Sequence, residues 1–155
     1  MNQATQFLLT ACLFGTSLLI LPAQAQSTAE NATLSPGFSP DPKQLKGTGG
    51  GAISARDIAG RADTPTGGCS GFVAAQPEHI LELKAFFKYL AVLVQSLEDT
   101  TIVVKGPGGT WCNDDYDGKN AGVSGQWLPG TYQVWVGSFK KGNALPHTLR
   151  ITETR

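Results

Sequence analysis

The chain has 155 residues, with 12 basic and 12 acidic side chains, so its formal net charge at neutral pH is zero. A nucleic-acid-binding protein needs a surplus of Lys and Arg to displace counterions from phosphates, so the balanced charge argues against nucleic acid as a partner. The length fits one domain of ordinary size together with a leader segment.

The first 25 residues predict a secretory signal peptide. They contain no charged side chain, and the run from Phe7 to Leu21 is almost wholly apolar. Ala23 and Ala25 place small residues at the −3 and −1 positions of a cut after Ala25. The run is too short for a transmembrane helix. We therefore expect a secreted or periplasmic protein without a transmembrane anchor.

A second interpretation of the leader uses its cysteine. Leu9-Thr10-Ala11-Cys12 resembles a bacterial lipobox, which would attach a lipid to Cys12. Few apolar residues precede Cys12 and the apolar run continues to Leu21, so the signal-peptide interpretation is preferred.

Residues 26–68 predict a flexible lead segment rich in Gly, Pro and Ser. Three prolines between Ser35 and Pro42 exclude a helix there, and the glycines from Gly47 to Gly51 are typical of a hinge. We expect at most one edge strand or helical turn in this segment, near residues 52–59.

From Cys69 onward, short apolar runs alternate with turn residues at a spacing of about 8–12 residues, which is typical of an all-β sandwich or barrel. We predict an antiparallel β-sandwich, jelly-roll-like, over residues 69–153. Its expected strands are residues 71–75, 79–85, 89–96, 100–105, 110–113, 125–128, 131–138 and 148–152. A helix over residues 77–85 is the less favoured alternative for the second strand.

Alternation within the strands indicates which side chains are buried. One expected core face consists of Tyr132, Val134 and Val136, so Trp135 should point to the opposite face and be exposed. The other expected core positions are Leu90, Val92, Val94, Thr100, Ile102, Val104, Leu149 and Ile151.

Two cysteines remain after the leader, Cys69 and Cys112. In an oxidising compartment they most simply form one disulfide, which would stabilise the fold by roughly 4 kcal/mol on the chain-entropy model. Two isolated cysteines without a nearby His cannot complete a tetrahedral zinc shell, so a metal site is the weaker alternative.

The order of four motifs points to a known family. An Asp-led strand (residues 99–104) is followed by a Gly-Pro-Gly-Gly turn (106–109), an acidic loop that begins at residue 113, and a Pro-Gly-Thr-Tyr strand (129–136). In this order, residues 87–152 resemble the bacterial pre-peptidase C-terminal domain. The resemblance implies a non-catalytic accessory β-sandwich that assists secretion, localisation or substrate binding. It implies as partner a secreted peptidase, a cell-surface protein or a polysaccharide.

The acidic loop is a candidate calcium site, because residues 113–120 offer three carboxylates and two amides. The spacing is not that of an EF-hand, and Thr101 stands where calcium-binding relatives carry an acidic residue. A solvated turn with Asx hydrogen bonds is the alternative. The candidate ligands are Asp99, Asn113, Asp114, Asp115 and Asp117.

Aromatic side chains form a second candidate site, namely Trp111, Tyr116, Trp127 and Trp135. An exposed aromatic row can stack on sugar rings or hold a protein partner, so a carbohydrate-binding module is an alternative function. In the competing interpretation, Trp111 and Trp127 only cap the sandwich, with Trp111 packed beside the disulfide.

Catalytic residues are scarce. A Ser-His-Asp triad needs all three side chains in contact, and His79 and His147 are the only histidines. The segment from Gly122 to Gly125 is not a Gly-x-Ser-x-Gly elbow, since no strand-to-helix turn accompanies it. We therefore predict no enzyme and no cofactor other than calcium, with a small secreted peptidase-like hydrolase as the alternative.

Overall fold

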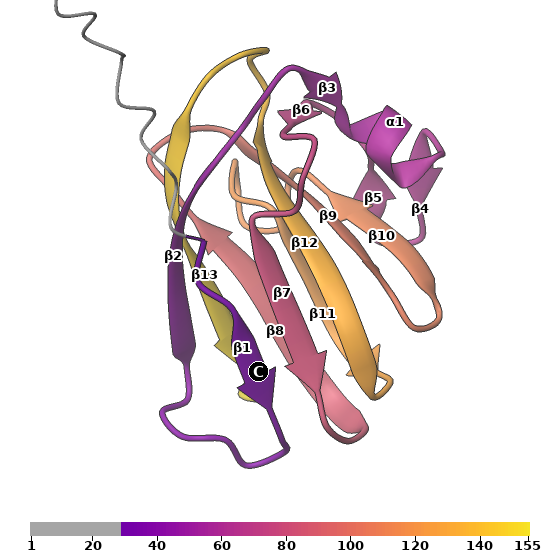
Figure 1. Cartoon of the computed structure of the whole chain (residues 1–155), viewed down its shortest axis with the longest axis vertical. Helices are drawn as coiled ribbons and strands as arrows, with labels where there is room; N and C mark the ends of the chain where they lie inside the picture. The colour runs from indigo at the N-terminus through magenta and orange to yellow at the C-terminus, as the bar shows by residue number, and fades with distance from the viewer. Residues whose placement is uncertain (1–28) are drawn as a thin grey trace, which may run out of the picture.

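The computed structural model describes residues 29–155 (Figure 1). The predicted signal peptide, its cleavage after Ala25 and the alternative lipid site at Cys12 lie outside the described residues. Within residues 29–155, no helix is long and apolar enough to cross a membrane.

The larger sheet has seven strands. Its main path runs β1-β7-β12-β9-β10, and β6 and then β3 continue beside the far end of β12. β1 is parallel to β7, and the other pairings are antiparallel. The strands are β1 (Ala32–Leu34), β3 (Ile53–Ser54), β6 (Phe72–Val73), β7 (His79–Leu83), β9 (Thr100–Gly106), β10 (Gly109–Asn113) and β12 (Gly130–Ser138).

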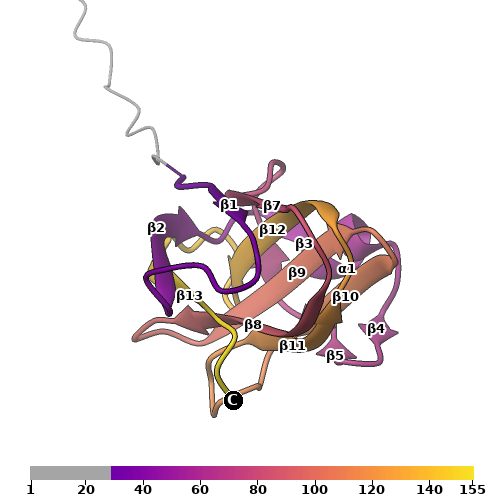
Figure 2. The same ribbon diagram turned by 90° about the horizontal axis from the view of Figure 1, so that it is seen from below.

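The smaller sheet has four antiparallel strands in the order β11-β8-β13-β2. Figure 2 shows the two sheets as layers, with β8, β11 and β13 facing β7, β9 and β12. Its strands are β2 (Lys43–Gly49), β8 (Phe87–Gln95), β11 (Gly122–Trp127) and β13 (Leu145–Thr152). The helix α1 (Ala55–Ala59) and the ribbon of β4 (Asp63–Thr64) and β5 (Gly67–Gly68) lie to one side.

The space between the sheets holds the main hydrophobic core. Every position that the alternation assigns to the core is buried, from Leu90 on β8 to Ile151 on β13. The predicted all-β sandwich is confirmed, and so is the strand rather than a helix at residues 79–83.

The prediction of a flexible lead segment is wrong for residues 29–68, because this part of the chain belongs to the sandwich. β2 pairs with β13 over seven residues, and Leu34 and Leu45 are buried in the main core. The signal was missed because the inward positions of β2 are Leu45, Gly47 and Gly49. Two glycines among three inward positions hide the apolar alternation that marks a strand.

The outer face of the larger sheet is also covered. Residues 53–73, here named the strap, carry α1 and the β4–β5 ribbon, and α1 packs on β9 and β10. A second apolar cluster joins the strap to this face: Val103, Cys112 and Trp135 come from the sheet, and the strap supplies Ala55, Ala59, Cys69 and Val73. Trp135 does point away from Tyr132, Val134 and Val136, but the expectation that it is exposed is wrong: the strap leaves it only 5% exposed.

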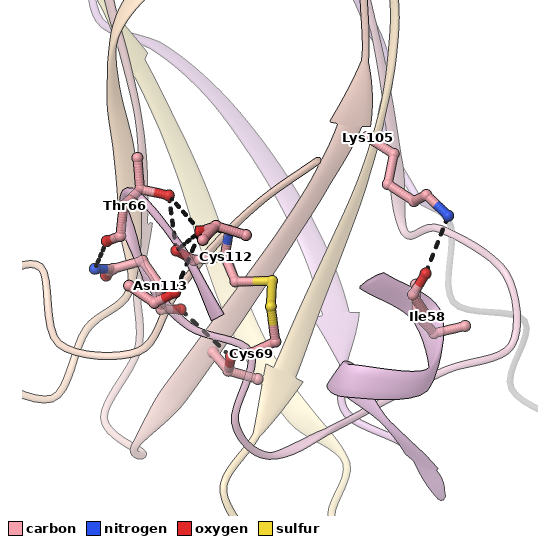
Figure 3. The surroundings of a disulfide bond; sticks show 9 residues. Ile58, Thr66, Cys69, Lys105, Cys112 and Asn113 are labelled. Atoms are coloured by element: carbon pink, nitrogen blue, oxygen red, sulfur yellow. Dashed lines mark hydrogen bonds between the residues drawn. A yellow bond between two sulfur atoms is a disulfide. The ribbon is translucent and has the colours of Figure 1, made fainter. Parts of the chain in front are cut away.

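The disulfide between Cys69 and Cys112 fastens the strap to β10 (Figure 3). Hydrogen bonds add to it: Thr66 Oγ1 donates to the Cys112 carbonyl at 2.8 Å, and Asn113 Nδ2 donates to the Thr66 carbonyl at 2.8 Å. Lys105 Nζ donates to the carbonyl of Ile58 on α1 at 3.0 Å. The strap is thereby held at both its helix and its cysteine.

Candidate functional site

A pocket of about 350 Å³ opens where the ends of β10, β11 and β12 meet. Three aromatic side chains form it, one from each strand: Trp111, Trp127 and Tyr132. The ring centroids of Trp127 and Tyr132 are 4.8 Å apart, and Trp111 lies 6.3 Å from Trp127 and 6.2 Å from Tyr132. The volume is that of a small-ligand site.

The polar ends of two of these rings are bonded within the protein. Tyr132 Oη donates to the Leu128 carbonyl at 2.9 Å, and Trp127 Nε1 donates to the Leu90 carbonyl at 2.9 Å. Burial raises the pKa of the Tyr132 hydroxyl, so it stays a neutral donor. These bonds hold the rings in place before any ligand arrives.

Gly106 on β9 makes the position of Tyr132 possible. A Cβ atom at residue 106 would collide with the Tyr132 ring, so the ring lies directly against the backbone of β9. The position therefore needs glycine for close approach.

The mouth of the pocket is apolar but carries hydrogen-bonding groups. Phe86 is 44% exposed and Leu128 48% exposed, which is high for such large apolar residues. Thr66, Ser124 and Gln126 supply hydroxyl and amide groups to the lining. No lining residue in the described part of the chain is charged. The pocket thus suits an uncharged ligand with both an apolar face and hydroxyl groups.

Three of the four predicted aromatics are at or beside this pocket. Trp111 and Trp127 line it, and the exposed Tyr116 Oη donates to Ser124 Oγ at 3.0 Å. Trp135 is buried under the strap and takes no part. The alternative that placed Trp111 beside the disulfide is also wrong, because Trp111 packs against the main core and Cys112 faces the strap.

Sequence reasoning missed Tyr132 and Phe86 as pocket residues. Tyr132 was expected in the core, and it is indeed buried there, but its ring also forms one wall. The available signal was an aromatic residue on each of three strands. β11 belongs to the smaller sheet and β10 and β12 to the larger one, so only the packing of the two sheets places these residues side by side.

The acidic loop between β10 and β11 is a tight backbone turn. Asp117 and Asn120 exchange backbone hydrogen bonds of 3.0 and 3.1 Å, and Asn120 Oδ1 accepts from Ser96 N at 3.3 Å. The Asn113 amide is used twice, since Oδ1 accepts from Gly122 N at 3.1 Å and Nδ2 bonds Thr66. Asparagine amides and backbone groups therefore order this loop.

The carboxylates of the loop lie farther out. Asp99, Asp115 and Asp117 are exposed and Asp114 is half-buried. Among residues 29–155, no three His, Cys, Asp or Glu side chains gather into a group that could hold a metal ion. The calcium site remains a prediction, to which backbone carbonyls and asparagine amides would have to contribute.

The two histidines contact each other. Their Nε2 atoms are 2.8 Å apart, and their Nδ1 atoms face backbone carbonyls of Glu30 and Leu145. Burial lowers the pKa of His79, and burial followed by the charge of His79 lowers that of His147 to about 4. Within the described residues neither imidazole hydrogen-bonds a Ser, Thr, Asp or Glu side chain.

No family model matches the chain. An uncharacterized protein of Synechococcus elongatus is 30% identical over 64 residues, which cover 41% of this chain and 47% of that protein. The chain thus spans about half the length of the curated relative that it matches.

Among solved structures, the chain is similar to the pre-peptidase C-terminal domain of a collagenase from Bacillus anthracis, with a TM-score of 0.43 and 11% identity. The match covers 79% of this chain and 95% of that domain. That domain is of the kind that the motif order in residues 87–152 resembles. The assignment of the β-sandwich rests on the two sheets themselves.

Proposed function

We propose that the protein is a non-catalytic binding module of an exported system, and that its aromatic pocket binds a neutral sugar unit of a polysaccharide. The observation that carries this proposal is an uncharged opening at which the half-buried Trp111 and the exposed Phe86 offer aromatic faces, with the buried rings of Trp127 and Tyr132 packed beside Trp111. Aromatic faces stack on the apolar face of a sugar ring, and the nearby Ser, Thr and Gln groups can bond its hydroxyls.

The accessory role is supported by the motif order. The resemblance to the pre-peptidase C-terminal domain implies a module that works beside a secreted peptidase or at a cell surface. The disulfide is compatible with an oxidising compartment outside the cytosol. Export by a signal peptide cut near Ala25 belongs to this proposal.

A binding role fits the chemistry of the described residues better than hydrolysis does. A serine hydrolase needs a histidine beside its nucleophile, and here both imidazoles are occupied by each other and by backbone carbonyls. We therefore include the absence of catalysis in the proposal. A serine-hydrolase probe that labelled the protein would contradict it.

The test is retention on immobilised neutral polysaccharides (cellulose, starch, dextran and a β-1,3-glucan), followed by titration with the retained oligosaccharide. Trp111 is the half-buried wall of the pocket, so Trp111→Ala should abolish retention. Ligand addition should change the tryptophan emission of the wild type. Gln126 is exposed, so Gln126→Glu should weaken retention without disturbing the core, by placing a charge at the opening.

Phe139→Ala is the matched control, because Phe139 is an aromatic that is 62% exposed and does not line the pocket. Its retention should equal that of the wild type. Equal retention of wild type and Trp111→Ala, or no binding to any neutral glycan, would contradict the proposal. Binding of a proline-rich peptide, without binding of any glycan, would assign the pocket to a protein partner.

A further inference from the structure

A buried pair of histidines joins the two sheets of the sandwich. His79 begins β7 in the larger sheet, and His147 lies on β13 in the smaller one. Their Nε2 atoms are 2.8 Å apart and their rings meet edge to face at 82°. Both are buried, with exposed fractions of 0% and 6%. The aromatic pocket uses neither of them.

The same pair holds the chain ahead of β1. His79 Nδ1 lies 2.6 Å from the carbonyl oxygen of Glu30. The Glu30 carboxylate also accepts from Lys46 N on β2 at 2.7 Å, and Asn31 Oδ1 accepts from Ile80 N at 2.7 Å. β1 itself pairs with β7 through only three residues, at the edge of the sheet. This edge is therefore held by the histidine, by these hydrogen bonds and by Leu34, which is buried in the main core.

The backbone of β2 makes room for both rings. Gly47 is the register partner of His147, and a Cβ atom at residue 47 would lie 2.9 Å from the Nε2 atom of each histidine. A larger residue at this position would push the imidazoles apart. The contact between them thus depends on glycine at residue 47.

The number of ring protons on the two histidines determines how the pair responds to acid. Carbonyl oxygens only accept hydrogen bonds, so each Nδ1 needs a proton to bond its carbonyl, and the contact between the Nε2 atoms needs one more. Two neutral imidazoles carry two protons. These fit the two short contacts: His79 Nδ1 donates to Glu30 O, and His147 Nε2 donates to His79 Nε2. The contact without a proton is then the long one, 3.3 Å from His147 Nδ1 to Leu145 O.

The contacts of the two imidazoles accommodate a third proton but not a fourth. A third proton on His147 Nδ1 would donate to Leu145 O and satisfy every contact. A fourth must go to the second of the two Nε2 atoms, so that two N–H groups face each other across 2.8 Å. That arrangement loses the hydrogen bond and sets two positive charges together, so the rings must separate.

We propose that His79 and His147 form an acid-released latch, which fastens β7 in the larger sheet to β13 and β2 in the smaller one and opens when the pair carries four protons. The contact that it releases is the one between the two Nε2 atoms, because His79 Nδ1 keeps its proton and still donates to the Glu30 carbonyl. The device is local, because the main core contacts of β7 and β13 do not pass through the imidazoles.

The neighbouring charges and the burial agree with release by acid. Burial lowers the pKa of His79, and the Glu30 carbonyl and carboxylate partly offset this. Burial and the charge of His79 lower the pKa of His147 to about 4. Of the other charged groups nearby, Lys46 on β2 is exposed, and the Glu78 carboxylate is bonded to β12. Since open imidazoles take up protons below about pH 6.5, the closed latch loses stability as the pH falls from there towards 4.

The test uses NMR on the whole chain, which has only two histidines to assign. At pH 7 the ring nitrogens should show opposite tautomers, with the proton on Nδ1 of His79 and on Nε2 of His147. As the pH is lowered through 4, the amide protection of the β2–β13 pairing around Gly47 and His147 should be lost while that of β8 is retained. Titration of both histidines near their ordinary value, or protection of this pairing that does not follow the second protonation, would overturn the proposal.

Two variants separate a latch from a merely structural pair. His147→Gln can still donate to His79 Nε2 but cannot take up a proton, so the β2–β13 pairing around residue 147 should stay protected at pH 4. Gly47→Ala should open the latch at pH 7 and lower the protection of this pairing there, whereas Thr48→Ala, an exposed neighbour on the same strand, should not. An acid profile of His147→Gln identical to that of the wild type would refute the latch. So would binding of zinc by the wild-type pair at pH 7, reversed by chelator, because it would make the pair a metal site.

Discussion

The two faces of the larger sheet are both buried, but by different means. The inner face, with Tyr132 and Val134, packs against the whole of the smaller sheet, whereas the outer face, with Val103 and Trp135, packs against the strap alone. Apolar residues run without a break through Ile102-Val103-Val104 and Val134-Trp135-Val136. Such runs are typical of strands that are buried on both faces, so alternation on one face does not mean that the other face is exposed.

Removing the disulfide should affect the two faces of the larger sheet most unequally. In Cys69→Ala/Cys112→Ala, the strap loses its covalent link across a sequence separation of 43 residues, so the free energy of unfolding should fall by about 4 kcal/mol. Hydrogen exchange should quicken more in α1 than in β8, because only the outer face depends on the strap. Denaturant unfolding and exchange mass spectrometry measure the two effects. Equal quickening in both elements would show that the strap and the core unfold as one unit.

Glu78 lies where the chain passes from the strap into β7, and it should make stability depend on pH. Its Oε2 accepts from Val136 N at 2.8 Å, its Oε1 has no partner within the described residues, and burial raises its pKa to about 7. The folded state therefore favours the protonated acid, and this stability is lost as the pH rises from about 4.5 to about 7. The loss should be about 3 kcal/mol.

Glu78→Gln keeps an acceptor for Val136 N but cannot ionise. The difference in unfolding free energy between wild type and variant, measured from pH 4.5 to pH 8, should move in favour of the variant as the pH rises. Taking this difference removes the contribution of the histidine pair, which both proteins share. A difference that stays constant with pH would mean that Glu78 ionises normally.

Substituting one tryptophan on each face of the sheet system should change the unfolding free energy by different amounts. Trp135 Nε1 is buried without a hydrogen-bond partner in the described part of the chain, whereas Trp127 Nε1 bonds the Leu90 carbonyl. Trp135→Phe removes an uncompensated donor and should change the unfolding free energy by less than about 1 kcal/mol, since the smaller ring offsets that gain. Trp127→Phe should cost about 1–3 kcal/mol more, and thermal melts of the two variants provide the comparison.

Calcium should have the smallest effect. The predicted calcium site has one half-buried carboxylate, Asp114, among exposed ones, so we expect only a small difference in melting midpoint between calcium and chelator. Asp114→Ala, at the half-buried carboxylate of the loop, is the control. A calcium-dependent rise of several degrees in the wild type that Asp114→Ala lacks would establish the predicted site.

The strands from β6 to β13 and the Cys69–Cys112 disulfide were predictable because they depend on local patterns and on cysteine number. The strand β2 was not, because its glycines are required by neighbours from other elements: Gly47 by the two histidines and Gly49 by Val136. The aromatic site was half predictable, with Trp111 and Trp127 expected and Tyr132 assigned only to the core.

The amino-acid sequence by itself determined the all-β class, the inward faces of the strands and the disulfide, since each follows from periodicity or composition along one segment. Only the tertiary structure decided which surface covers Trp135, which aromatics share a pocket and that His79 meets His147. These contacts join residues such as His79 and His147 that lie far apart in the chain, and they depend on strand order and register, which no single segment encodes.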